Sequence, residues 1–280
     1  MKEFKSFYKE VGGNEGNKCQ YNIRLDTYGC GCQHDCKYCY AKSLLSFRNL
    51  WNAEQPSIGD VKHLKRTIDK IPKGTIIRLG GMTDCFQPLE LDYRITYKII
   101  KYLNKRRIGY LIVTKSHLVA NDEYLKIYDK DLAHFQITTT CLDDNLYKKL
   151  DYEKASLPSE RIKAILKLQN AGFDVAIRLS PLIEEYIDFD KLNNLGIKKA
   201  QVEFLRANHW IKKWFDVDYS KFTVKQSGYE HLPLKEKIKI ISKIKIPEIS
   251  VCEDEDGAYE YWKENVNVNK EDCCNLRRND

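Results

Sequence analysis

The chain has 280 residues, 42% of them hydrophobic, and its 47 basic and 40 acidic residues give a formal net charge of +7. A chain of this length can bury one large core, so we expect a single domain with a tail. No apolar stretch approaches the roughly 20 residues of a membrane-spanning helix, and the N-terminus lacks the apolar core of a signal peptide. With ten cysteines and no secretion signal, the composition predicts free thiols in a soluble, cytoplasmic protein without a membrane partner.

Strand and helix patterns alternate along most of the chain. After a polar lead-in, 1–20, the patterns predict strand 21–28, helix 60–71, strand 75–80, helix 89–104, strand 109–114, helix 121–130, strand 133–140, helix 159–171, strand 174–180 and strand 199–205. Leu64 and Ile68 recur at helical spacing, whereas 111–113 is an apolar run typical of a sheet that is covered on both faces. Six strands that alternate with helices predict an α/β fold over 21–206.

The pattern loosens beyond residue 206. Helix 234–243 and a short strand 248–252 are the elements predicted in this part of the chain. No repeat, low-complexity tract or Gly/Ser linker marks a second independent domain. We therefore expect 207–280 to be an extension that packs on the main unit.

Three closely spaced cysteines follow the first predicted strand. Cys32, Cys36 and Cys39 have the spacing C-x3-C-x2-C. An iron–sulfur cube normally takes four thiolates, so three would leave one iron open to bind another group, which indicates catalysis. A zinc site with Cys30 or His34 as the fourth ligand is the alternative, although zinc sites favour C-x2-C pairs.

This spacing, with Tyr38 in the aromatic position before the last cysteine, resembles the signature of the radical S-adenosylmethionine (SAM) superfamily. The resemblance implies a [4Fe-4S] cluster on Cys32, Cys36 and Cys39, with SAM bound to the fourth iron and Tyr38 beside it. An electron from a donor such as flavodoxin or ferredoxin would then cleave SAM to methionine and a 5'-deoxyadenosyl radical, which abstracts hydrogen from a substrate. It also implies a partial (β/α)6 barrel of the TIM type, with the reactive groups at the C-terminal strand ends and the extension closing the barrel.

The end of the second strand carries Gly80-Gly81, followed by Thr83 and Asp84. Paired glycines let the backbone approach a ligand that a β-carbon would block. The superfamily has a Gly-Gly-Glu-like motif here that contacts the methionine amine, so Thr83 and Asp84 are candidate oxygen donors. A glycine turn that caps a helix is the alternative.

The next three strand ends supply further candidates for SAM binding. Lys115 could pair with the SAM carboxylate or with a substrate anion. Thr138 resembles the ribose-contacting position of the superfamily, although threonine also simply suits a strand. Arg178 lies in an apolar strand and needs the SAM carboxylate or an acidic side chain as a partner. Ser180 ends the same strand, and we count it with Arg178 as a candidate for SAM binding.

The stretch from 32 to 181 looks like the spore photoproduct lyase-like branch of the superfamily. The resemblance rests on Cys39-Tyr40-Ala41 and on the runs 83–90, 113–116 and 158–161. It implies a nucleobase substrate, a thymine derivative in DNA, for repair or modification. The cysteine that returns a hydrogen in the lyase corresponds to Gly81 here, which argues against photoproduct repair itself.

Other residues are candidates for returning a hydrogen to the substrate radical. Cys85, Cys141, Cys273 and Cys274 are the candidate thiols, because an S–H bond is weaker than a C–H bond. Each could equally be an inert, buried thiol. Tyr40 resembles a tyrosine that relays hydrogen in the lyase, with a packing role as the alternative.

Aromatic and basic residues of the extension fit a DNA substrate. The candidate platforms for an extruded base are Trp210, Trp214, Tyr259 and Trp262. Lys212-Lys213 could face phosphates, or be part of a solvated surface. A small metabolite or a peptide is the alternative substrate, and a non-catalytic module stapled by metal is a third hypothesis.

Overall fold

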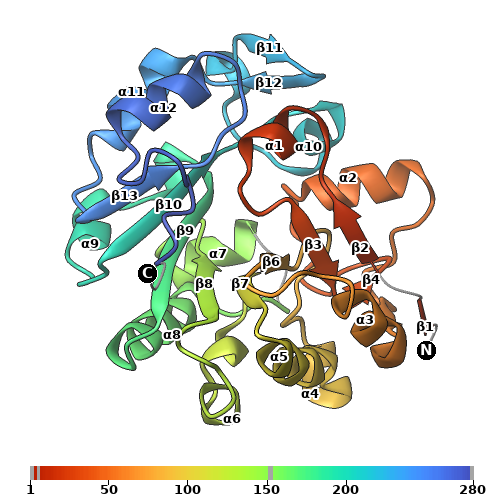
Figure 1. Ribbon diagram of the computed structural model, residues 1–280. Helices are drawn as coiled ribbons and strands as arrows, with labels where there is room; N and C mark the ends of the chain where they lie inside the picture. The colour runs from red at the N-terminus through yellow and green to blue at the C-terminus, as the bar shows by residue number, and fades with distance from the viewer. Residues whose placement is uncertain (1–2, 5–6, 151–153, 278–280) are drawn as a thin grey trace.

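The computed structural model describes residues 3–4, 7–150 and 154–277, and a curved sheet of eight strands forms its centre (Figure 1). In spatial order the strands are β13 (Glu248–Val251), β10 (Lys199–Phe204), β9 (Asp174–Leu182), β8 (Ala133–Thr138), β7 (Gly109–Thr114), β6 (Ile76–Leu79), β3 (Ile23–Asp26) and β2 (Phe7–Glu10). All neighbouring pairs are parallel except β2 with β3. This is the α/β class and partial TIM-type barrel that the sequence predicts.

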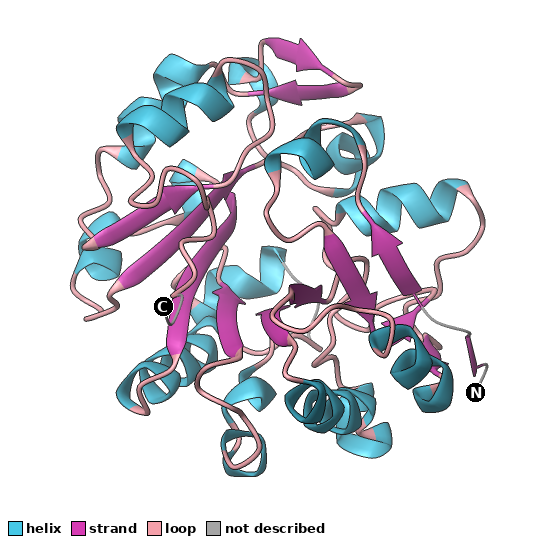
Figure 2. Ribbon diagram, in the orientation of Figure 1, coloured by secondary structure: helices cyan, strands magenta, loops and turns pink. Residues whose placement is uncertain are grey.

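Helices cover the outer side of the arc of strands (Figure 2). The larger ones here are α3 (Val61–Ile68), α5 (Ile95–Arg106) and α8 (Pro158–Asn170). The shorter ones are α4 (Leu89–Tyr93), α6 (Asp122–Leu125) and α7 (Asp144–Leu150), which come between them in the chain, and α9 (Phe189–Asn193), which follows α8. Ile99, Leu103 and Ile165 are fully buried on these helices, against the outward-facing side chains of the strands. No helix among the described residues is long and apolar enough to cross a membrane.

The helix predicted at 89–104 is in fact two helices. Arg94, which separates α4 from α5, adopts a left-handed conformation with φ of 54°. The Glu90 carboxylate accepts the backbone N–H groups of Thr96 and Tyr97 at 2.9 and 2.8 Å. The side chain thus caps α5, which explains why the helix restarts there.

The segments outside 21–206 add to the sheet at both edges. In the lead-in, β2 pairs with β3, and α1 (Gly13–Lys18) follows it. In the extension, β13 pairs with β10 as a seventh parallel strand. The extension also contains α10 (His209–Trp214), β11 (Val224–Gln226), β12 (Tyr229–His231), α11 (Leu234–Ile241) and α12 (Ala258–Asn265). Because β2 and β13 are the two edges, the described strands form an open arc.

The C-terminal tail, residues 272–277, packs on the inner side of the arc. Leu276 joins Tyr21 and Leu111 in a small apolar cluster that is separate from the main core. The Lys199 ammonium donates to the Asn275 carbonyl at 2.6 Å. The tail therefore covers part of the inner surface of the sheet.

Candidate active site

The loop that carries the three cysteines follows β4 (Tyr28–Gly29), a short strand paired with β5 (Ser57–Gly59), which also pairs with β1 (Glu3–Phe4). Cys32 and Cys36 are buried, Cys39 is half-buried, and all three side chains reach one cavity. Burial raises the pKa of Cys32 to about 12, so its thiolate needs a nearby positive charge, which iron would supply. The donor set fits a cluster held by three thiolates.

The cavity joins the cysteine loop to the C-terminal ends of β6, β7 and β8. Its lining residues are Cys32, His34, Asp35, Cys36, Cys39, Tyr40, Ala41, Trp51, Arg78, Gly80, Gly81, Met82, Thr83, Asp84, Val113, Thr114, Lys115 and Thr138. Parallel strands present their reactive groups at this end in barrels of this type. The cavity therefore lies where the chemistry of such a fold is expected.

Contacts with neighbouring segments fix the path of the cysteine loop. Gly31 has φ of 146° and passes so close to Asn52 that a β-carbon would lie 1.9 Å from its carbonyl oxygen. The Asp35 carboxylate accepts from Lys42 Nζ and Trp51 Nε1, both at 3.0 Å. The loop is thus held open around the cavity by its own backbone and by neighbouring side chains.

Asp26, at the end of β3, shapes the glycine turn that follows β6. Its Oδ1 accepts the backbone N–H groups of Gly81 at 2.9 Å and of Met82 and Thr83 at 3.0 Å. Burial raises the pKa of Asp26 to about 6, and these hydrogen bonds oppose the rise. With its N–H groups engaged, the turn has backbone carbonyls left as acceptors for a ligand amine. Tyr40 already donates its hydroxyl to one of them, that of Gly81.

Asp84 is bonded on all sides by the protein. Its carboxylate accepts from Thr114 Oγ1 and from the Lys115 N–H, both at 2.7 Å, and from the Phe86 N–H at 2.8 Å. It also lies 3.2 Å from His34 Nδ1. Burial would raise the pKa of Asp84, but His34 and the hydrogen bonds lower it to about 2. Asp84 therefore joins the cysteine loop to the end of β7, and the Thr83 hydroxyl likewise bonds within the protein, to the Tyr28 carbonyl.

Lys115 and Thr138 reach the cavity from the next two strands. The Lys115 ammonium lies 5.4 Å from the centre of the Tyr38 ring, within the range of a cation–π contact. Tyr38 is buried and packs edge-on against Phe215, with ring centres 5.4 Å apart. The structure thus brings the cluster cysteines, the glycine turn, Lys115 and Thr138 together.

Arg178 and Ser180 do not line the cavity. Arg178 donates to Glu203 Oε2 at 2.5 Å and to Gln136 Oε1 at 2.6 Å. Ser180 donates to the same Glu203 oxygen at 2.8 Å. Of the two partners that the sequence allows for Arg178, the structure contains the acidic side chain.

The four candidate thiols also lie outside the cavity. Cys85 and Cys141 are fully buried in the main core. Cys273 and Cys274 belong to the tail, on the inner side of the arc, where Cys273 approaches Cys252. Cys252 is missing from the sequence-based candidates, as are Asp26 and the cavity-lining Arg78.

The fold and the site together define a class of enzyme. Its members are built on a partial α/β barrel and have a cofactor cavity, lined by cysteines, at the C-terminal ends of the strands. Residues 27–193 match the radical SAM superfamily, and the chain belongs to this superfamily. Membership implies a [4Fe-4S] cluster and SAM as cofactors, and it removes the hypothesis of a non-catalytic module.

Other known proteins share part of the sequence or the fold of this chain. An uncharacterized protein of Methanocaldococcus jannaschii is 27% identical over 243 residues, which cover 79% of this chain and 85% of that protein. Spore photoproduct lyase complexed with dinucleoside spore photoproduct is 15% identical, with a TM-score of 0.64 over 88% of this chain and 78% of the lyase. A variant of the lyase with bound AdoMet and dinucleoside spore photoproduct is 14% identical, with a TM-score of 0.62 over the same shares. At such identities the lyase structures show a shared fold.

Proposed function

We propose that this radical SAM enzyme abstracts a hydrogen atom from a nucleobase in DNA, with a thymine derivative as the target. The observation that carries the proposal is the single cavity lined by Cys32, Cys36, Cys39 and the Gly80-Gly81 turn. When bound, the cluster supplies the electron that cleaves SAM to methionine and a 5'-deoxyadenosyl radical. The chain's own residues bind SAM, orient its 5' carbon and keep water away from it.

The cavity offers complementary groups for each part of SAM. The carbonyl oxygens of the Gly80-Gly81 turn would accept from the ammonium of the methionine half. Lys115 would pair with the carboxylate, and Thr138 would approach the ribose. Asp84 and His34 would act as positioning residues, because their bonds hold the cysteine loop against β7. Arg178 and Ser180 would act through Glu203 and not on SAM.

Tyr40 is the candidate in the cavity for hydrogen transfer to or from the substrate. Desolvation raises the pKa of its hydroxyl to about 12, so the phenol keeps its hydrogen at neutral pH. Gly81, in contrast, offers no thiol, and a β-carbon there would lie 3.1 Å from Arg24 and 3.2 Å from Asp26, so a side chain would require these neighbours to shift. A modification of the base is therefore better supported than photoproduct repair through a thiol at this position.

The substrate assignment rests on α10 and its neighbour α2 (Tyr40–Phe47), the helix that follows the cysteine loop. Trp210 is 37% exposed and lies 5.7 Å from Trp214, ring centre to ring centre. Lys42 lies over the Trp214 ring, and Lys213 lies over the Trp210 ring. Aromatic rings beside lysines can stack bases and contact phosphates, and this surface adjoins the cavity. Dinucleoside spore photoproduct in the structurally similar lyase supports a nucleobase as the substrate class.

The test is SAM cleavage in an oxygen-free, cluster-reconstituted preparation with dithionite, or with flavodoxin or ferredoxin as the electron donor. We expect DNA that contains thymine to accelerate formation of 5'-deoxyadenosine, and deuterium from a deuterated thymine methyl group to enter that product. DNA affinity should fall steeply with salt, because phosphate contacts release counterions. A rate of 5'-deoxyadenosine formation that does not change when DNA is added, without deuterium transfer, would contradict a nucleobase substrate.

A small polar metabolite is the second candidate substrate. Both side-chain polar atoms of Gln201, and the hydroxyl of Ser250, have no hydrogen-bond partner in the described part of the chain. Both residues are buried, and the strand register places Gln201 between Arg178 of β9 and Ser250 of β13. Unpaired buried polar atoms are costly unless a ligand or water satisfies them. Deuterium transfer from a metabolite extract, and none from DNA, would favour this candidate.

A further inference from the structure

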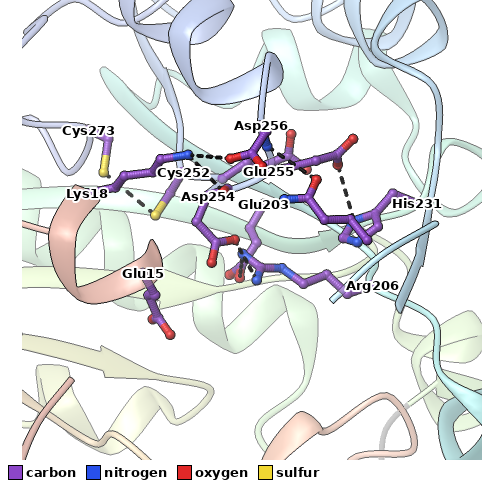
Figure 3. Close-up of polar contacts among 12 residues, drawn as sticks. Glu15, Lys18, Glu203, Arg206, His231, Cys252, Asp254, Glu255, Asp256 and Cys273 are labelled. Carbon is purple, nitrogen blue, oxygen red and sulfur yellow. Dashed lines mark hydrogen bonds and ion pairs between the residues drawn. The ribbon is translucent and has the colours of Figure 1, made fainter. Parts of the chain in front are cut away.

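A second group of thiols lies outside the cofactor cavity. Cys252 directly follows β13, and Cys273 comes from the C-terminal tail; their Sγ atoms are 3.7 Å apart (Figure 3). Both side chains are partly exposed, and all ten cysteines are free thiols. Two segments distant in sequence therefore bring a pair of thiols into contact.

Rigid contacts hold each thiol in place. The Cys252 N–H donates to the Val202 carbonyl at 2.8 Å, which continues the pairing of β13 with β10. The loop after Cys252 is anchored by an ion pair of 2.7 Å between Asp254 and Arg206 (Figure 3). On the tail side, the Tyr21 hydroxyl donates to Asp272. The short S–S distance is thus set by folded segments on both sides.

The surroundings differentiate the two sulfur atoms. Cys273 donates its hydrogen to Cys252, and the pKa of Cys252 is lowered by this bond and by the cations Arg178 and Arg78, against the effects of burial and of Glu203. The same bond raises the pKa of Cys273, which keeps the proton. A thiol with a lowered pKa in contact with a second thiol is the arrangement that favours thiol–disulfide exchange.

We propose that Cys252 and Cys273 form a redox-active dithiol that closes to a disulfide and fixes the tail to the end of β13. The Cys252 thiolate attacks one sulfur of a small disulfide RSSR, forming Cys252–S–S–R and releasing RS⁻. Cys273 then loses its proton and attacks the Cys252 sulfur, which releases the second RS⁻. Two protein thiols are oxidised and RSSR is reduced to two RSH: one released RS⁻ takes the Cys273 proton, and the other takes from water the proton that Cys252 gave up when it ionised. The sulfur atoms must approach from 3.7 Å to about 2.05 Å for the bond to form.

The site adjoins the cofactor cavity but does not depend on the proposed substrate. Arg78 lines that cavity, and its charge also lowers the pKa of Cys252, so the two sites share one electrostatic neighbour. The tail covers the inner side of the arc, where Cys274 and Leu276 are buried. A disulfide would therefore lock the inner wall of the barrel next to the cavity.

The test uses the oxygen-free holoenzyme in mixtures of oxidised and reduced glutathione or dithiothreitol. Free thiols are alkylated at each ratio and the peptides are mapped by mass spectrometry. We expect a peptide cross-linked through Cys252 and Cys273 that grows with the oxidised fraction, and in the reduced state we expect Cys252 to be alkylated at least tenfold faster than the buried Cys85. If both thiols stay free at every ratio, or pair with other cysteines instead, the proposal is wrong.

Variants separate the dithiol from a metal site made by the same sulfur atoms. Cys252→Ser and Cys273→Ser should each abolish the cross-link, whereas Cys19→Ser, which removes a neighbouring thiol, should preserve it. Cys19 and Cys274 lie near the pair. Protection of Cys19, Cys252, Cys273 and Cys274 by added zinc, lost in Cys19→Ser, would show a metal site and overturn the dithiol. Formation of 5'-deoxyadenosine is measured in parallel, so failure of the proposed catalytic function is visible separately.

Discussion

At the scale of single residues, two buried carboxylates organise the cavity by binding backbone. Asp26 fixes three N–H groups of the glycine turn, and Asp84 joins the cysteine loop to the end of β7. Hydrogen bonds to an ionised acceptor are roughly twice as strong as neutral ones. The arrangement of the groups that would bind SAM therefore depends on two carboxylates that would not contact SAM themselves.

Asp26 makes SAM binding sensitive to acid. Its pKa is raised to about 6 from the ordinary 3.8 by burial, so the folded protein binds this proton more tightly than the unfolded chain does. Its contribution to stability is therefore complete below pH 3.8 and lost as the pH rises through about 6. SAM binding should follow the opposite trend, because a protonated carboxyl cannot accept from all three N–H groups.

We expect SAM affinity, measured by calorimetry, to fall about tenfold between pH 7.5 and 5, which is about 1.4 kcal/mol. Asp26→Asn should bind SAM about tenfold more weakly at pH 7.5 and show little further change in acid. The amide has one acceptor oxygen and turns an N–H group toward the N–H groups of the turn. A wild-type affinity that is flat over this range would count against the role of Asp26.

Cys36→Ala should abolish cluster binding, because two thiolates cannot hold three corners of a cube. Iron and sulfide content, and the broad visible absorbance of the reconstituted protein, are the measurements. Cys30→Ser is the matched control: Cys30 is half-buried at the start of the same loop but does not line the cavity. Equal iron loss in both variants would instead indicate a site with four protein ligands.

At the scale of elements, a buried ion cluster fixes α11 to the loop after β13. Lys237 is fully buried and donates to Glu253 at 3.0 Å and to Glu255 at 2.6 Å. Trp262 of α12 donates to Glu253 at 2.9 Å. The cluster therefore positions the loop that begins at Cys252.

Lys237→Met should destabilise the protein by about 3 kcal/mol, because it leaves two carboxylates buried without their cation. Urea unfolding measures the change. Lys239→Met, on the same helix, removes an exposed pair with Glu236 and should change stability by at most about 0.5 kcal/mol. Similar effects of the two substitutions would show that the buried cluster contributes no more than a surface pair.

Elements with strong local signals could be predicted closely from the sequence. Strand 109–114 and helix 159–171 correspond to β7 (Gly109–Thr114) and α8 (Pro158–Asn170). The interruption at Arg94 could not be predicted, because apolar periodicity continues through it and the cause is the Glu90 side chain. Likewise α2 and α10 are absent from the predicted elements.

The candidate site likewise contains residues that local motifs predict and residues that they do not. The cysteine spacing and the paired glycines are local motifs, and the structure brings them to one cavity. Asp26 lies 55 positions from Gly81, and Cys252 lies 21 from Cys273. Such partners are set by strand order, which spacing within one segment does not reveal.

At the scale of the whole molecule, the C-terminal tail connects segments that are far apart in the sequence, on the inner side of the arc. Tyr21, just before β3, is buried against Cys274 and Leu276 of the tail. The Arg277 N–H donates to Asp174 at the start of β9 at 2.8 Å. The tail thus joins the first strand of the barrel to its later strands without a strand pairing.

Truncation after Glu271 should therefore weaken the whole fold without removing any strand of the sheet. The loss includes the buried Leu276, worth about 2 kcal/mol, and several hydrogen bonds of about 1 kcal/mol each, so we expect about 4 kcal/mol. The urea midpoint should fall while far-ultraviolet circular dichroism stays near that of the full chain. Leu276→Ala should show about half of this effect, whereas Val268→Ala, at a position that is 55% exposed, should change little. An unchanged midpoint after truncation would mean that the tail does not hold the barrel together, and the inner side of the arc would then have to be stable without it.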